Sequence, residues 1–184
     1  MISIAKNKKA LSTCVTTLII LVASSLGAGT ITLYATEIAQ STLQKEQIVY
    51  LDTRVWVMLN GTAYAAVAIC NVGDADTLIK SIQVRGAPID WKNAEFLTLN
   101  EIFTTTLNPP AATVDWSNFS YTGPSTGSFS PGNGPLPLKS GASIVTYFGN
   151  LYSVKLQDIG SVVGLTILTA NNQYYVQCNV QLAI

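Results

Sequence analysis

The sequence contains no histidine, and only 11% of its residues are charged. Without histidine, the commonest general base and the commonest zinc ligand are both missing. The three cysteines form no Cys-x-x-Cys pair, the spacing typical of metal knuckles. The few carboxylates are scattered, and no glycine-rich phosphate loop precedes a helical pattern. The sequence therefore indicates no enzyme, no metal site and no cofactor.

Charge is scarce and unevenly placed, whereas a typical soluble domain has about 25% charged residues. Lys6, Lys8 and Lys9 lie in the first nine positions, and the remainder of the chain has seven basic against ten acidic residues. No basic stripe for nucleic acid is present. Threonine, serine, asparagine and glycine supply the polar residues instead. Such composition favours an extracellular protein that packs against copies of itself.

A long apolar run follows the N-terminal lysines. Ala10 to Thr36 contains no charged residue over twenty-seven positions, and about 20 apolar residues suffice to cross a bilayer as a helix. We expect one helix from Leu11 to about Gln47, apolar on all sides over its first two-thirds. A helix of this kind is buried in lipid or in protein.

Three interpretations of this helix compete. A secretory signal would be cleaved near the small residues of "ASSLGAG" and discarded, although the apolar run continues beyond them through "TITLYAT". A membrane anchor would keep its N-terminus in the cytoplasm, because the lysines precede the span. In the third interpretation a short leader is removed and the helix is retained.

The third interpretation rests on a resemblance. Lys8-Lys9-Ala10 followed directly by Leu11-Ser12-Thr13 resembles the class III signal of archaeal type IV pilins and archaellins. The resemblance implies cleavage between Ala10 and Leu11 by a prepilin peptidase, with loss of residues 1–10. Bacterial type IV pilins have a glutamate where this chain has Val15, so the resemblance is to the archaeal members. The helix 11–47 would then leave the membrane to form a filament core, which would include Leu18, Ile19, Ile20, Leu21, Val22 and Leu26.

Beyond Gln47 the hydrophobic period changes to two, which predicts strands. Seven short segments, separated by Gly, Asn and Asp, predict an antiparallel β-sandwich over residues 48–184: 49–59, 62–71, 77–85, 143–149, 151–157, 160–170 and 173–184. "NAEFLTLNEIF" (93–103) is the best candidate for a short helix. "AICNVGDADTLIKSIQVRG" and "PLPLKSGASIVTYF" resemble a hairpin and a turn of archaeal pilin heads, which implies an immunoglobulin-like head. The expected fold class is α+β.

One segment of the head differs in composition. Thr104 to Leu138 contains six of the seven prolines, together with many Ser, Thr, Gly and Asn residues. This composition predicts a long surface loop rather than central strands. Trp116, Phe119 and Tyr121 would either pack the loop onto the domain or contact a neighbouring subunit.

Two sequons fit the pattern for N-glycosylation, Asn60-Gly61-Thr62 and Asn118-Phe119-Ser120. Both lie at expected turns or loops of an exported domain, so Asn60 and Asn118 are candidate acceptors.

The cysteines leave two alternatives open. Cys70 and Cys178 lie on two expected strands of the sandwich, where they either form a disulfide or remain separate buried thiols. Cys14 lies in the apolar run and is expected to act as a small hydrophobic residue. Asp74 and Asp76 lie in an expected turn, where they more often serve turn geometry than bind calcium.

The resemblance implies a structural subunit of an adhesive archaeal surface pilus. Its partners would be identical subunits in a helical homopolymer, the prepilin peptidase and the pilus assembly machinery, with no nucleic acid. The protein would be inserted in the cytoplasmic membrane before assembly and exposed on the cell surface afterwards. Two alternatives stay open: an archaellin of a motility filament, or a membrane-anchored extracellular β-sandwich that binds a ligand.

Overall fold

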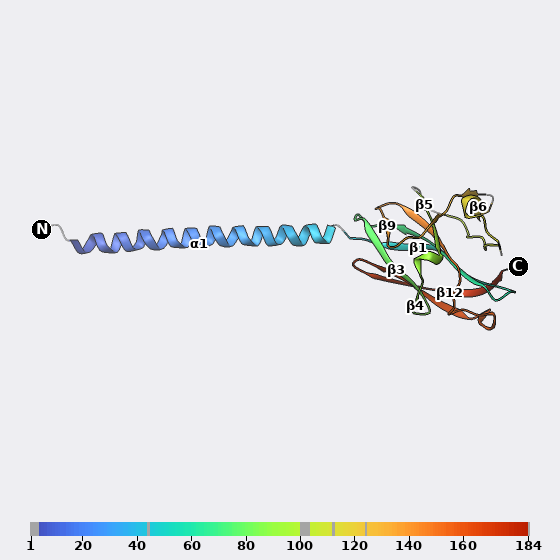
Figure 1. Cartoon of the computed structure of the whole chain (residues 1–184). Coiled ribbons are helices and arrows are strands. Elements are labelled where there is room, and N and C mark those ends of the chain that lie inside the picture. Colours follow the sequence, from blue (N-terminus) through green and yellow to red (C-terminus); the bar gives the residue numbers. More distant parts are fainter. Residues whose placement is uncertain (1–3, 44, 100–103, 112, 124, 184) are drawn as a thin grey trace. The chain divides into compact units, whose positions relative to one another are not determined.

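The computed structural model describes residues 4–43, 45–99, 104–111, 113–123 and 125–183. The chain divides into two compact units, Met1–Gln44 and Lys45–Ile184 (Figure 1). The first unit is a helix and the second, which we call the head, is built of strands. The expected α+β class is confirmed at this level.

The first unit is one helix, α1, from Ile4 to Leu43. It begins seven residues before the expected start, because residues 5–10 contain no proline or glycine to stop it. It ends four residues before the expected Gln47. Seven of its Ser and Thr hydroxyls donate to backbone carbonyls three or four residues earlier, as Thr16 Oγ1 does to Ser12 O at 2.8 Å. These hydroxyls are therefore satisfied within the helix.

The head contains twelve strands and three short 3₁₀ helices among its described residues. The strands are β1 Ile48–Met58, β2 Ala63–Asn71, β3 Thr77–Val84, β4 Ala87–Pro88, β5 Ala94–Leu99, β6 Phe119–Thr122, β7 Ser125–Gly127, β8 Ser130–Pro131, β9 Leu136–Leu138, β10 Ser143–Phe148, β11 Val162–Thr169 and β12 Gln173–Ala183. The 3₁₀ helices are η1 Trp91–Asn93, η2 Trp116–Asn118 and η3 Leu156–Asp158.

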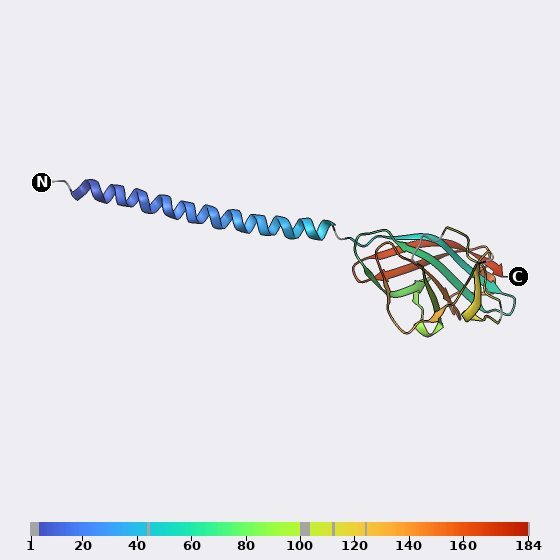
Figure 2. The same ribbon diagram turned by 90° about the horizontal axis from the view of Figure 1, so that it is seen from above.

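Ten of these strands form one sheet in the order β4-β3-β11-β12-β1-β2-β10-β5-β8, with β9 also paired to β3. The first and last strands of the head, β1 and β12, pair in parallel with Val55 opposite Val180 (Figure 2). This pairing joins the first half-sheet (β1, β2, β10, β5, β8) to the second (β12, β11, β3, β4, β9). The head is thus a single curled sheet, a half-barrel, rather than two separate layers.

The concave side of the curl holds the main core. Alternate residues of both half-sheets point into it, as expected from the period of two. Fully or almost fully buried members include Val55, Val67, Ile82, Leu165 and Ile167. The core therefore depends on both half-sheets together.

A second core lies on the convex side of the first half-sheet. The chain from Leu107 to Phe129, which we call the cover segment, packs there against Tyr147, which is fully buried. The rings of Trp116, Phe119 and Phe129 lie 5.6, 5.0 and 5.5 Å from the ring of Tyr147, centroid to centroid. Of the two expectations for the proline-rich loop, packing onto the domain is the one observed.

The hydroxyl of Tyr147 fixes the backbone of the cover segment. It donates to Asn108 O at 2.9 Å and lies 3.2 Å from Tyr121 O. Burial raises the pKa of Tyr147 far above its usual value, so the phenol remains a neutral donor.

Two expected elements are wrong. The expected helix over 93–103 is strand β5 in its described part, because Ala94–Leu99 pairs with β10 along its length; residues 100–103 lie outside the described structure. The expected strand over 151–157 is an irregular turn that leads into η3. The other six expected strands are present as β1, β2, β3, β10, β11 and β12.

Candidate functional site

The surface of α1 is apolar all round. Its Ser12–Ile38 segment spans 27 residues with a mean hydropathy of 1.9, which makes it long and apolar enough to cross a membrane. The six residues expected in a filament core are exposed along it, from 46% for Val22 to 67% for Leu21. Because residues 18–22 are consecutive, they point in all directions around the helix. The helix thus has no single side that would pack on one partner.

The expected cleavage bond, Ala10–Leu11, lies within the helical backbone of α1. The structure describes no side-chain surroundings at these two residues. Cleavage there remains a prediction.

The head holds its first residues, Lys45–Gln47, through an almost buried carboxylate. Glu46 is 7% exposed. Its side chain accepts hydrogen bonds from the hydroxyls of Thr77 and Thr169 and, at 3.1 Å, from Asn172 Nδ2. Burial by itself would raise the pKa of the Glu46 carboxyl. The hydrogen bonds, of which that from Thr169 contributes most, lower the pKa by a larger amount, so it lies below its usual value.

The backbone of this anchor segment, Lys45–Gln47, is held as well. Gln47 O accepts from Val72 N at 2.8 Å, and Lys45 O accepts from Asp74 N at 3.1 Å. The side chain of Asn71, fully buried, accepts from Gln47 N at 3.3 Å. The Asn71-Val72-Gly73 turn therefore binds the segment along one side, while the Glu46 side chain reaches β3 and β11 on the other.

Gly73 is required for this close approach. A Cβ atom at Gly73 would lie 2.2 Å from Lys45 O and 2.5 Å from Gln47 N, both backbone atoms. No side chain fits there without moving the anchor segment. No local sequence pattern predicts this contact, because Gly73 and the anchor segment are far apart in the chain.

The two candidate glycosylation sites are exposed. Asn60 lies in the turn between β1 and β2, where its Oδ1 accepts from Thr62 N at 2.9 Å. Asn118 ends η2, also on the surface. Both meet the requirement of accessibility, and glycosylation itself remains a prediction.

The three cysteines are free thiols, and of the two expected as separate buried thiols only Cys70 is buried, whereas Cys178 is half-buried. Cys70 lies two and four positions after Ala68 and Ala66 on β2, so its side chain points to the same convex face as theirs. Cys178, by contrast, packs against the concave core. Two side chains on opposite faces of one sheet cannot bond without a register shift. Burial also raises the pKa of Cys178 to about 11, which disfavours the reactive thiolate.

The Asp74–Asp76 turn serves backbone geometry. Asp76 Oδ1 accepts from Ser140 N at 2.8 Å. Among the residues that the structure describes, no group of three or more Cys, Asp or Glu side chains is placed to hold a metal ion.

No family model matches the chain, and no curated protein matches it. Several solved structures align to part of it, and two of them are glycosidases. One is a family 123 glycoside hydrolase from Clostridium perfringens, at 10% identity and a TM-score of 0.29 over 69% of this chain. The other is a β-glucosidase from Listeria innocua, at 12% identity and a TM-score of 0.25 over 74% of this chain. The alignments cover 21% and 16% of those two proteins, and similarity this low carries no conclusion about fold family or activity.

Proposed function

We propose that this protein is the structural subunit of an archaeal type IV-like surface pilus, that it polymerises through α1, and that it has no catalytic role. The observation that carries the proposal is the helix surface. Over Ser12–Ile38 large apolar side chains are exposed on every side of α1. An all-round apolar helix finds equivalent surroundings in lipid and in a bundle of its own copies.

The energetics agree with this assignment. Burying a Leu, Ile or Val side chain is worth roughly 1.5–3 kcal/mol relative to water. Burial of the six α1 residues expected in the filament core is therefore worth on the order of 10 kcal/mol. The helix therefore cannot remain in water. Seven of its Ser and Thr hydroxyls are bonded internally, so these seven need no hydrogen-bond acceptor in either lipid or a filament core.

The head supplies the features that an outer sheath needs. Its anchor segment is held by Glu46, Asn71 and the turn at Gly73, so a load on the chain at Lys45 is transferred to three strands of the sheet. Its low charge reduces repulsion between closely packed copies. We further propose that the curled sheet is a variant of the immunoglobulin-like head, with its two half-sheets joined through β1 and β12.

A second candidate is a membrane-anchored extracellular binding domain. It is favoured by the length and hydropathy of Ser12–Ile38, which suit a simple span equally well. Such a protein would retain residues 1–10 and would not polymerise. An archaellin is the third candidate and shares both the leader and the helix.

N-terminal mass spectrometry of protein sheared from the cell surface tests the proposal. A mature chain that starts at Leu11, in a fraction that contains filaments by electron microscopy, is the expected result. An intact Met1 start in a membrane fraction would establish the anchor instead, and a start near Gly29 would establish a discarded signal. Loss of swimming, rather than of attachment, after gene deletion would identify an archaellin.

A further inference from the structure

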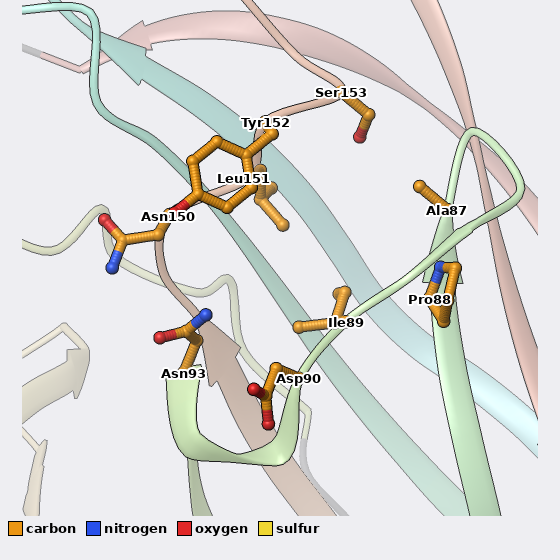
Figure 3. A pocket seen from close by; sticks show the side chains of 9 residues that line it. All are labelled: Ala87, Pro88, Ile89, Asp90, Asn93, Asn150, Leu151, Tyr152 and Ser153. Carbon is orange, nitrogen blue, oxygen red and sulfur yellow. The ribbon is translucent and has the colours of Figure 1, made fainter.

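A hollow of about 150 Å³ lies between two segments of the head, Ala87–Asn93 and Asn150–Ser153 (Figure 3). We propose that it binds a neutral pyranose residue of a glycan, so that the head recognises saccharide. This inference rests on the proposed surface pilus for its biological meaning, because a head on a pilus is exposed to glycans outside the cell, and on the geometry of the hollow for its chemistry.

One wall of the hollow is an exposed aromatic ring. Tyr152 is 89% exposed, the largest exposed fraction among the exposed large hydrophobic residues of the described chain. Figure 3 shows the ring of Tyr152 on one side of the hollow and Asp90 on the other. Leu151 and Ile89 lie between them. Covering an aromatic face that is exposed to water with an apolar surface is energetically favourable. A pyranose presents such a surface, because the C–H groups of one ring face lie together.

The opposite side of the hollow is polar and uncrowded. The carboxylate of Asp90 and the amide of Asn93 line it, and the amide of Asn150 lies beside Tyr152 (Figure 3). Within the described residues, neither amide side chain has a hydrogen-bond partner, and Asp90 uses Oδ1 to accept from Lys92 N at 3.1 Å. A carboxylate accepts and an amide both donates and accepts, which matches adjacent hydroxyls that do both.

The backbone holds these groups in place before any ligand arrives. Gly149 N donates to Asn93 O at 2.9 Å, which ties the two segments together. Asn93 N donates to Asp90 O at 2.9 Å. Asn150 is one of two described non-glycine residues with a positive φ, 55°, a backbone conformation that is uncommon outside glycine and that often occurs at functional sites.

A second hollow adjoins the first, and the two together offer room for more than one sugar unit. This second hollow, of about 360 Å³, shares Asn150, Leu151 and Tyr152 with the first and extends to Asn60 and Thr62. The ring of Tyr152 therefore borders free space on both sides.

Binding is measured with the full chain in detergent, produced in a host without N-glycosylation so that Asn60 carries no sugar. The probes are serum albumin carrying mannose, galactose, glucose or N-acetylglucosamine, with unmodified albumin as the blank. We expect one probe or more to bind above the blank. Tyr152→Ala should weaken that binding about tenfold or more through loss of the ring face, and Tyr152→Phe should keep most of it.

Tyr175→Ala is the matched control, because Tyr175 is also an exposed tyrosine (58%) but lies on β12 outside both hollows. Its binding should equal that of the unchanged chain. No binding of any of the four probes, or equal binding by Tyr152→Ala, overturns the inference. Filaments that form but bind no probe refute only this site, and a chain that binds a probe but forms no filaments refutes only the pilus.

Discussion

The convex faces of the two half-sheets differ in their covering. On the first half-sheet the cover segment buries Tyr147 completely, together with Ala66, Ala68 and Val145. On the second half-sheet, Tyr175 and Val162 remain 58% and 57% exposed.

The outward side chains account for the difference. Many of those on the first half-sheet are apolar, including Trp56, Met58, Ala66 and Tyr147, and apolar residues favour burial. Those of β12 are mainly amides that water solvates well: Gln173, Gln177, Asn179 and Gln181. Tyr175 lies over Gly164 in place of a cover, and its hydroxyl accepts from Gln177 Nε2 at 3.0 Å. The cover segment is therefore placed where an apolar sheet face would otherwise meet water.

The largest expected effect comes from the centre of the covered face. Tyr147→Ala should lower the free energy of unfolding by about 3–5 kcal/mol, the range for large aromatic core residues. Thermal unfolding of the full chain in detergent, followed by near-ultraviolet circular dichroism, measures the loss. Tyr147→Phe, which removes only the hydroxyl, should cost about 1 kcal/mol. Equal effects of the two variants would mean that the ring contributes little.

Trp116→Ala should have the next largest effect, about 2 kcal/mol, because Trp116 is only half-buried. Its ring contacts Phe119, Phe129 and Tyr147. Limited proteolysis should then cut within the cover segment while the strands of the concave core stay intact. Cleavage that spreads at once to β11 would contradict the view that the two cores are separate.

Glu46→Gln tests the side-chain contacts that hold the anchor segment on β3 and β11, with an expected loss of about 1–3 kcal/mol at neutral pH. The folded-state pKa of Glu46 is lowered from 4.5, so its contribution is present above the unfolded pKa and is lost as the pH falls through the folded pKa. The unchanged chain should therefore lose part of its stability on acidification, and Glu46→Gln should lose less. Parallel pH profiles for the two proteins would show that ionised Glu46 contributes nothing.

The smallest effect is expected on the convex face of the second half-sheet, which no segment covers in the described structure. Tyr175→Ala removes an exposed ring and should change the free energy of unfolding by about 0.5 kcal/mol or less. A loss comparable to that of Tyr147→Ala would show that the second half-sheet also depends on an aromatic cover. The same thermal unfolding measurement decides between these results.

The sequence predicted the parts of the fold that depend on neighbouring residues. Alternation in 49–59 and 173–184 predicted the first and last long strands, and the unbroken apolar run predicted α1. The aromatic residues among the prolines left two alternatives open, packing on the domain or contact with a neighbouring subunit, and the cover segment corresponds to the first.

What the sequence did not predict depends on distant residues. Glu46 follows a helical pattern, and its partners Thr77 and Thr169 lie 31 and 123 positions away. The parallel pairing of β1 with β12 has no local signal either. Cys70 could not be assigned to a face, because β2 is apolar on both faces. The hollow beside Tyr152 combines residues from two loops and has no sequence motif.

The internally bonded hydroxyls of α1 have a mechanical consequence. Thr16, Thr30 and Thr32 already donate within their own helix, so none of the three has a proton left to donate to a neighbouring helix. Along the apolar stretch between them, contacts with a neighbour are mainly dispersion contacts, each worth about 0.1–0.2 kcal/mol per atom pair. In the proposed filament, sliding of one helix past another would therefore break no hydrogen bond donated by these three hydroxyls.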